Sequence, residues 1–116
     1  VPIYLQMIRH VKQGLAAGTV QNGDELPSRR ILSAMLAVNP NTVQKAYRQL
    51  EEEGLIQSRP GAGSRITASR EQIDQIRSEL FRTEVQETVA AMKGMGLKKE
   101  EAVELLRRLY DEEEEG

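Results

Sequence analysis

The sequence contains no cysteine and no tryptophan, and its aromatic residues are three tyrosines and one phenylalanine. Without cysteine it can form neither a disulfide framework nor a thiolate metal site. No apolar run approaches the roughly 18 residues of a membrane-spanning helix, and no basic segment followed by an apolar one suggests export. These absences favour a cytoplasmic globular protein. The first residue is Val1 rather than Met, so a few residues are expected to precede it.

Catalytic groups are equally scarce. The single histidine, His10, falls within the first predicted helix, where a partly exposed structural position is the simpler interpretation. No nucleophile with a neighbouring base and no pair of catalytic carboxylates is evident, so no enzymatic function is expected. Glu100, Glu101 and Glu104 lie at a predicted helix start, where the helix dipole favours acidic residues without any metal. Neither a metal nor a cofactor is predicted, and a small-molecule effector is left open.

Charge is distributed unevenly along the 116 residues, whose formal net charge is −2. Residues 1–68 carry eight Lys and Arg against five Asp and Glu, a net of +3. Residues 69–116 carry eight against thirteen, a net of −5. A basic front half suits an anionic partner, and an acidic back half would be repelled by one. On charge alone, an uneven scatter over solvated surfaces stays open.

Periodicity and capping residues predict three helices in the front half. Apolar residues at three-to-four spacing predict a helix over residues 2–18. Ser28 is suited to cap a short second helix. Asn39 followed by Pro40 is suited to begin a third helix, which stops at Gly54.

The back half is predicted to be wholly helical. Ser69 with Gln72 three residues later is a capping-box pattern that opens a long helix. Glycines at positions 94 and 96 end it, and a last helix is predicted from Lys98 to about Asp111. The glutamate run over 112–115 is expected to fray.

The second and third predicted helices are separated only by residues 37–39, which fits a helix-turn-helix. In that geometry the third helix enters the DNA major groove. Its donor-rich side, able to bind base edges or phosphates, carries Asn41, Thr42, Gln44, Lys45 and Arg48. Arg29 and Arg30 open the second helix, where arginine opposes the helix dipole unless an anion offsets it. A merely solvated amphipathic helix is the alternative interpretation.

Two short β-prone runs, 55–58 and 64–67, flank a glycine-rich turn and predict a hairpin that could serve as a wing. Glycine lets the backbone come close to phosphates, which arginine side chains can bind. The residues concerned are Arg59, Gly61, Gly63 and Arg65. An ordinary exposed turn fits the same residues.

The predicted fold is mainly α (α+β), with a winged helix-turn-helix DNA-binding domain over residues 1–68 and a two-helix dimerisation tail over 69–116. The tail helices carry apolar stripes that need a partner surface, which a second subunit would provide. The stripe residues are Ile73, Ile76, Leu80, Val85, Val89, Met92, Leu106 and Leu109. The alternative is that the stripe packs against its own winged helix.

Several separated segments match one family in order and spacing: Pro2-Ile3-Tyr4, then residues 23–30, 38–43 and 47–56. The chain resembles GntR-type bacterial regulators over roughly residues 2–67, with a tail similar to the short YtrA type. The resemblance implies DNA contacts from Arg30, Asn39, Asn41, Thr42, Gln44, Arg59, Gly61 and Gly63. Pro40 stands where some relatives have arginine, so Lys45 or Arg48 is expected to supply the charge. The resemblance also implies a dimerising tail and repression of operons for ABC transport systems.

A winged-helix module that binds protein rather than DNA is the main alternative. The donor-rich third helix and an aromatic content of only 3% argue against it, because protein interfaces use aromatic anchors. The sequence therefore predicts a DNA-binding transcription regulator, a homodimeric repressor that reads an inverted-repeat operator. Its operator, its effector and its target genes are not predicted.

Overall fold

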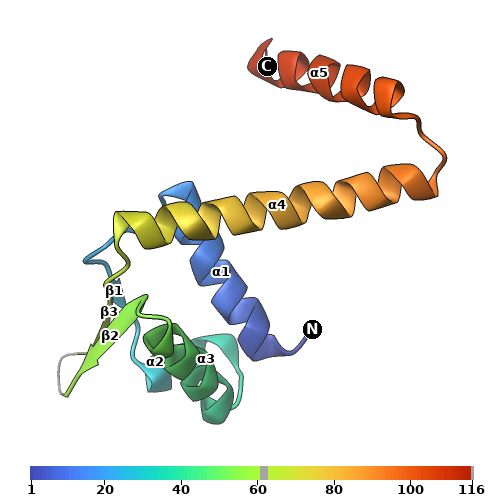
Figure 1. Ribbon diagram of the computed structural model, residues 1–116. Helices are drawn as coiled ribbons and strands as arrows, with labels where there is room; N and C mark the ends of the chain where they lie inside the picture. The colour runs from blue at the N-terminus through green and yellow to red at the C-terminus, as the bar shows by residue number, and fades with distance from the viewer. Residues whose placement is uncertain (61–62, 116) are drawn as a thin grey trace. The chain divides into compact units, whose positions relative to one another are not determined.

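The computed structural model describes the backbone of residues 1–60 and 63–115 and consists of five helices and three short strands within those ranges (Figure 1). In chain order the elements are α1 Ile3–Ala17, β1 Glu25–Leu26, α2 Arg29–Leu36, α3 Pro40–Glu52, β2 Ile56–Arg59, β3 Gly63–Ile66, α4 Arg70–Gly94 and α5 Lys99–Glu115. The predicted fold is confirmed: a mainly helical winged helix-turn-helix is followed by two further helices. No helix in the described ranges is long and apolar enough to cross a membrane.

The chain forms two compact units, Val1–Leu80 and Phe81–Gly116, and helix α4 contributes to both. The first unit holds the helix-turn-helix, the three strands and the beginning of α4. The sequence places the domain division at 68/69, where the hairpin gives way to a helix. That functional division stays a prediction, while packing divides the chain within α4.

Side-chain caps begin three of the helices as predicted. The Ser28 hydroxyl accepts a hydrogen bond from the Ile31 amide, and the Asn39 side chain accepts one from the Asn41 amide. At α4 the capping box is complete: the Ser69 amide donates to the Gln72 side chain and the Gln72 amide donates to the Ser69 hydroxyl. Each such cap satisfies amides that the first helical turn leaves unpaired, which contributes about 1 kcal/mol.

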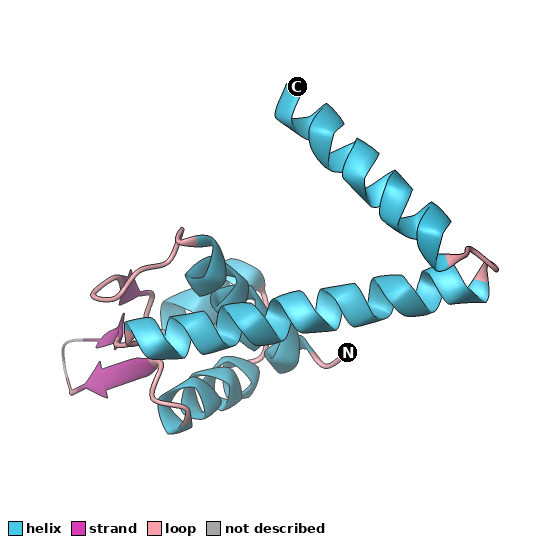
Figure 2. Cartoon of the chain, turned by 45° about the horizontal axis from the view of Figure 1, so that its top comes forward, coloured by secondary structure: helices cyan, strands magenta, loops and turns pink. Residues whose placement is uncertain are grey.

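The three strands form an antiparallel sheet in the order β1-β3-β2, seen together at one edge of the first unit in Figure 2. The hairpin of β2 and β3 was predicted, with Ile56 paired to Ile66 and Arg59 to Gly63. Strand β1 was not predicted, because a two-residue strand has no detectable alternation. It pairs Glu25 with Arg65 and so ties the segment before α2 to the wing.

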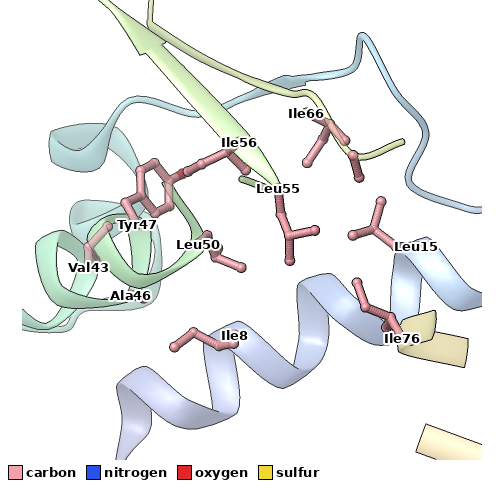
Figure 3. Close-up of a cluster of buried hydrophobic side chains, with 11 residues drawn as sticks. Ile8, Leu15, Val43, Ala46, Tyr47, Leu50, Leu55, Ile56, Ile66 and Ile76 are labelled. Atoms are coloured by element: carbon pink, nitrogen blue, oxygen red, sulfur yellow. The ribbon is translucent and has the colours of Figure 1, made fainter. Parts of the chain in front are cut away.

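The core of the first unit gathers apolar side chains from α1, α3, the sheet and α4 (Figure 3). Leu15, Val43, Leu50 and Ile66 are its largest fully buried side chains. Ile76 of α4 is 7% exposed and completes the cluster. Burying one such side chain contributes roughly 1.5–3 kcal/mol, so this unit has a core of its own.

The second unit has no comparable core among its described residues. A tight turn joins its helices: the Leu97 amide donates to the Met92 carbonyl, and Gly96 has a φ of 76°. Such a left-handed residue after a helix is typical of glycine, as the sequence predicted. Helix α5 continues to Glu115, whereas the sequence predicted an end near Asp111. The backbone of residues 112–115 is helical, and their fraying stays a prediction.

Candidate nucleic-acid interface

Helices α2 and α3 are joined by a turn of only three residues. Ala37 takes a left-handed conformation with a φ of 53°, and the Val38 amide donates to the Ser33 carbonyl at 3.1 Å. A non-glycine residue in this region is strained by roughly 1–2 kcal/mol. The turn redirects the chain so that α3 begins at once, with Asn39 as its cap and Pro40 at its first turn.

Helix α3 is divided into a buried and an exposed side. Val43, Ala46, Tyr47 and Leu50 are buried in the core. On the other side Asn41 and Arg48 are exposed, and Thr42 and Gln44 are half-buried. The exposed donors are those that the sequence predicted for DNA, and they lie in the first two turns and the middle of the helix. This placement leaves their amide and guanidinium groups free of the core.

Lys45 differs from the neighbouring donors, because its side chain is directed at another helix. Its Nζ atom lies 4.1 Å from the centre of the Tyr4 ring in α1. A lysine over an aromatic face gains a favourable electrostatic contact. In this position Lys45 links α1 to α3. A DNA contact of Lys45 stays a prediction, and the Tyr4 ring competes with DNA for its ammonium group.

Arg29 is engaged inside the protein, whereas Arg30 beside it is exposed. The Arg29 guanidinium pairs with the Glu51 carboxylate at 2.8 Å and lies 5.1 Å from the centre of the Tyr47 ring. Ser58 of β2 completes the cluster by donating its hydroxyl to Glu51. These partners argue against the predicted DNA contact of Arg29 and leave Arg30 as the exposed arginine of α2.

The cluster shifts two ionisable groups. The Ser58 hydroxyl, and with it Arg29, holds the pKa of Glu51 below its ordinary value despite the opposing effect of burial. Burial raises the pKa of Tyr47, and the nearby Arg29 charge offsets this only in part. The Tyr47 hydroxyl donates to the Pro27 carbonyl at 2.7 Å. Arg29, Tyr47, Glu51 and Ser58 thereby connect α2, α3 and the wing.

The wing carries two exposed arginines. Arg59 ends β2 opposite Gly63, and Arg65 lies on β3 between Glu25 and Gln57. Gly63 has a φ of 74°, a conformation that glycine adopts without strain, as predicted for a close turn. Gly61, also predicted as a DNA contact, lies outside the described residues.

The predicted tail residues fall into two groups. Ile76 is buried in the core of the first unit, and Ile73 and Leu80 pack against it. These contacts with their own winged helix agree with the alternative interpretation, and a role of the three in a dimer stays a prediction. The others stay accessible: Met92 is half-buried, and the exposed ones are Val85, Val89, Leu106 and Leu109.

Two features of the site had no signal in the sequence. The engagement of Arg29 depends on Glu51 and Ser58, which lie 22 and 29 residues further along the chain. The exposure of Ile31 and Met35 on α2 was equally unforeseen. Within the described residues no group of three His, Asp or Glu side chains is placed to hold a metal ion.

The arrangement of α1, α2, α3 and the wing corresponds to one known family. The family model described as "Bacterial regulatory proteins, gntR family" matches residues 3–66, more than half of the chain. The chain belongs to the GntR family. It is therefore a DNA-binding transcription regulator and not an enzyme, and its helix-turn-helix and wing are GntR elements.

Individual GntR relatives match this chain over different lengths. An uncharacterized HTH-type transcriptional regulator, YhcF of Bacillus subtilis, is 37% identical over 103 residues, which cover 89% of this chain and 85% of that protein. The transcriptional repressor YtrA of Bacillus subtilis is 46% identical over 66 residues, 57% of this chain. The match spans about half (51%) of the length of YtrA.

Solved GntR structures show the same arrangement of elements. A GntR family transcriptional regulator from Listeria monocytogenes has 30% identity and a TM-score of 0.81 over 93% of this chain and 95% of that one. YtrA from Sulfolobus acidocaldarius, a GntR-family transcription factor, has 32% identity and a TM-score of 0.54 over 97% and 90%. The short tail is thus a shared feature of these GntR proteins.

Proposed function

We propose that this GntR regulator is a homodimeric repressor that binds an inverted-repeat operator. The observation that carries the proposal is the contrast on α3 between a buried apolar side and exposed Asn41 and Arg48. Similarity to a protein named a transcriptional repressor supports the direction of regulation. Because bacterial operators lie on the chromosome, the protein would act in the cytoplasm.

Exposed apolar residues of the second unit support the dimer. Val85 and Val89 of α4 are 44% and 42% exposed, and Leu106 and Leu109 of α5 are 41% and 46% exposed. Helices in proteins gain most of their stability by packing an apolar side against a neighbour. A second chain provides that burial, and a two-fold dimer would present two recognition helices to half-sites roughly 34–36 Å apart.

The DNA-contact residues take two roles in this proposal. Asn41, Thr42 and Gln44 read base edges at the start of α3, with Arg48 further along the helix. Contacts with phosphates come from Arg30 on α2 and Arg59 on the wing, where Gly63 permits close approach. Asn39 keeps its side-chain amide available, since only its oxygen is used in the cap.

Enrichment from a randomised duplex library at two salt concentrations tests the proposal, because specific and electrostatic binding differ in salt dependence. The expected result is a palindrome whose enrichment survives at the higher salt. Binding without any enriched sequence would contradict operator recognition and favour the protein-interaction alternative. The position of the enriched site on the chromosome then tests the further prediction that an operon for an ABC transport system is controlled.

A further inference from the structure

An apolar groove lies on the first unit between α1 and the two helices of the helix-turn-helix. Its volume is about 760 Å³, and its lining includes no Asp, Glu, Lys or Arg. Helix α1 lies beside α3 at this place (Figure 1). The apolar lining includes Ile3, Met7 and Val11 of α1 and Leu32 and Leu36 of α2. Ile3 and Leu36 are 51% and 49% exposed at its margin.

Helix α5 of the second unit has the complementary form. Its apolar residues recur at three-to-four spacing and so share one side of the helix. Five of them are exposed, namely Val103, Leu105, Leu106, Leu109 and Tyr110. A helix with anchors at this spacing is the usual occupant of an apolar groove on another protein.

The charges of the two helices are also complementary. Helix α1 contains two basic residues, Arg9 and Lys12, and no acidic residue. Lys12 is paired with Glu53 at 2.8 Å, so Arg9 supplies the positive charge beside the groove. Arg9 lies one turn from Gln6 and Gln13, which line the groove, so it flanks the groove. Helix α5 contains three basic residues against eight acidic ones, a net of −5. The positive charge of Arg9 favours an acidic helix in the groove and helps to select its orientation.

We propose that α5 of a second copy of the chain occupies this groove, reciprocally in the two subunits. The proposal rests on the proposed dimer and specifies how it is built. Pairing of α5 with α5 would cover one apolar surface and leave the groove open, whereas the reciprocal arrangement covers both surfaces in each chain. Two identical contacts also follow directly from two-fold symmetry. Dimerisation would thereby brace α1 against the recognition helix.

The absence of cysteine from the chain permits a direct test by cross-linking. One full-length version carries a single cysteine at the groove margin, and a second version of different mass carries a single cysteine on α5. The groove variants are Gln6→Cys, His10→Cys and Gln13→Cys, and the α5 variants are Val103→Cys, Leu106→Cys and Tyr110→Cys. The control is Gln57→Cys, exposed on β2 and outside the groove lining.

After subunit exchange and oxidation, a mixed-mass disulfide band is expected for at least one groove–α5 pair and not for the control. If disulfides form only between two α5 cysteines, the groove proposal is overturned, whereas the proposed dimer is not. A third version carries the groove cysteine and the α5 cysteine in the same chain. If a disulfide forms only within this chain, the groove is occupied by α5 of the same subunit, and the proposal is overturned. A wild-type protein that sediments as a monomer at every concentration would instead contradict the proposed dimer itself.

A pair of adjacent substitutions gives a second readout. Leu36 lines the groove, whereas Met35 is 69% exposed on the same helix and does not line it. Leu36→Asn is expected to raise the dimer dissociation constant about tenfold or more, because it removes a leucine contact from the interface. Met35→Asn is expected to raise the same constant by less than about twofold. Both side chains are largely exposed, so both variants are expected to fold. Equal effects in sedimentation would contradict the groove as the interface.

Discussion

The two units of the chain differ in how far they bury their apolar side chains. The first unit surrounds Leu50 and Ile66 with its own helices and sheet, so its helix-turn-helix is held by contacts within one chain. The second unit leaves Val85, Val89, Leu106 and Leu109 exposed on two helices. Apolar surface that a small unit leaves exposed commonly marks an interaction site. The difference supports the proposed arrangement, in which the first unit binds DNA with a fold of its own and the second unit offers its exposed apolar side chains to a second chain.

The largest expected effect is the difference in unfolding free energy between a substitution of a core leucine and one of a tail leucine. Leu50→Ala should lower the free energy of unfolding by about 2–5 kcal/mol, because a fully buried leucine leaves a cavity. Leu109→Ala should scarcely change the unfolding of a dilute monomer and should weaken dimerisation. Urea denaturation at two protein concentrations measures both effects. Equal losses of stability at low concentration would break the distinction between the units.

The recognition helix offers a test within the first unit. Asn41→Ala should lose about 1–3 kcal/mol on the enriched operator and little on random DNA. Arg59→Ala should weaken binding to all sequences and reduce the salt slope by about one. Salt titrations of both variants against operator and random duplexes give these values. Identical behaviour of the two variants would contradict the division into base and phosphate contacts.

The Arg29–Glu51–Ser58 cluster predicts a pH dependence that belongs to the first unit. The folded-state pKa of Glu51 is lowered, so its contribution to stability is present above its unfolded-state pKa and is lost as pH falls through the folded-state value. Glu51→Gln should therefore be less stable than wild type at neutral pH, with the difference shrinking under acid conditions.

Glu52→Gln is the matched control, because Glu52 is exposed one position further along α3. Thermal melts from neutral pH to about pH 3 should leave its difference from wild type nearly constant, because Glu52 lies outside the cluster formed by Arg29, Glu51 and Ser58. A constant difference for Glu51→Gln as well would show that the cluster does not couple to protonation.

The smallest expected effect concerns the turn of the helix-turn-helix. Ala37→Gly should stabilise the protein by about 0.5–1 kcal/mol, because glycine relieves the left-handed strain at a φ of 53°. Ala34→Gly, within α2, should destabilise it by about the same amount. Chemical denaturation resolves these opposite signs. Destabilisation by both changes would argue that Ala37 is not strained.

The sequence predicted most of the fold because local signals agreed with one another. Asn39 and Pro40 predicted the start of α3, and Ser69 with Gln72 predicted the start of α4. The capping hydrogen bonds involved span three residues or fewer, so they can be inferred from the local sequence. Strand β1 escaped prediction because it exists only by pairing with β3, roughly forty residues away. The missed elements are thus those that depend on distant partners.

The same limit explains the outcome at the candidate site. The exposed position of Arg48 follows from the periodicity of α3 alone. Arg29 and Lys45 looked equally available in the sequence, and only the approach of Glu51 and of the Tyr4 ring engages them within the protein. Ile76 likewise joined the core because the start of α4 lies against it, which the apolar stripe did not specify.

Binding to operators of altered spacing tests the division of labour between the units most directly. The enriched palindrome would be compared with a version whose half-sites are separated by a further five base pairs, about half a helical turn. Two chains are expected to bind the native palindrome. The insertion should reduce affinity to that of a single half-site, because the proposed dimer holds its two recognition helices at a fixed spacing and cannot follow the rotated groove. Equal affinity for both duplexes, or one chain per palindrome, would contradict a dimeric reader.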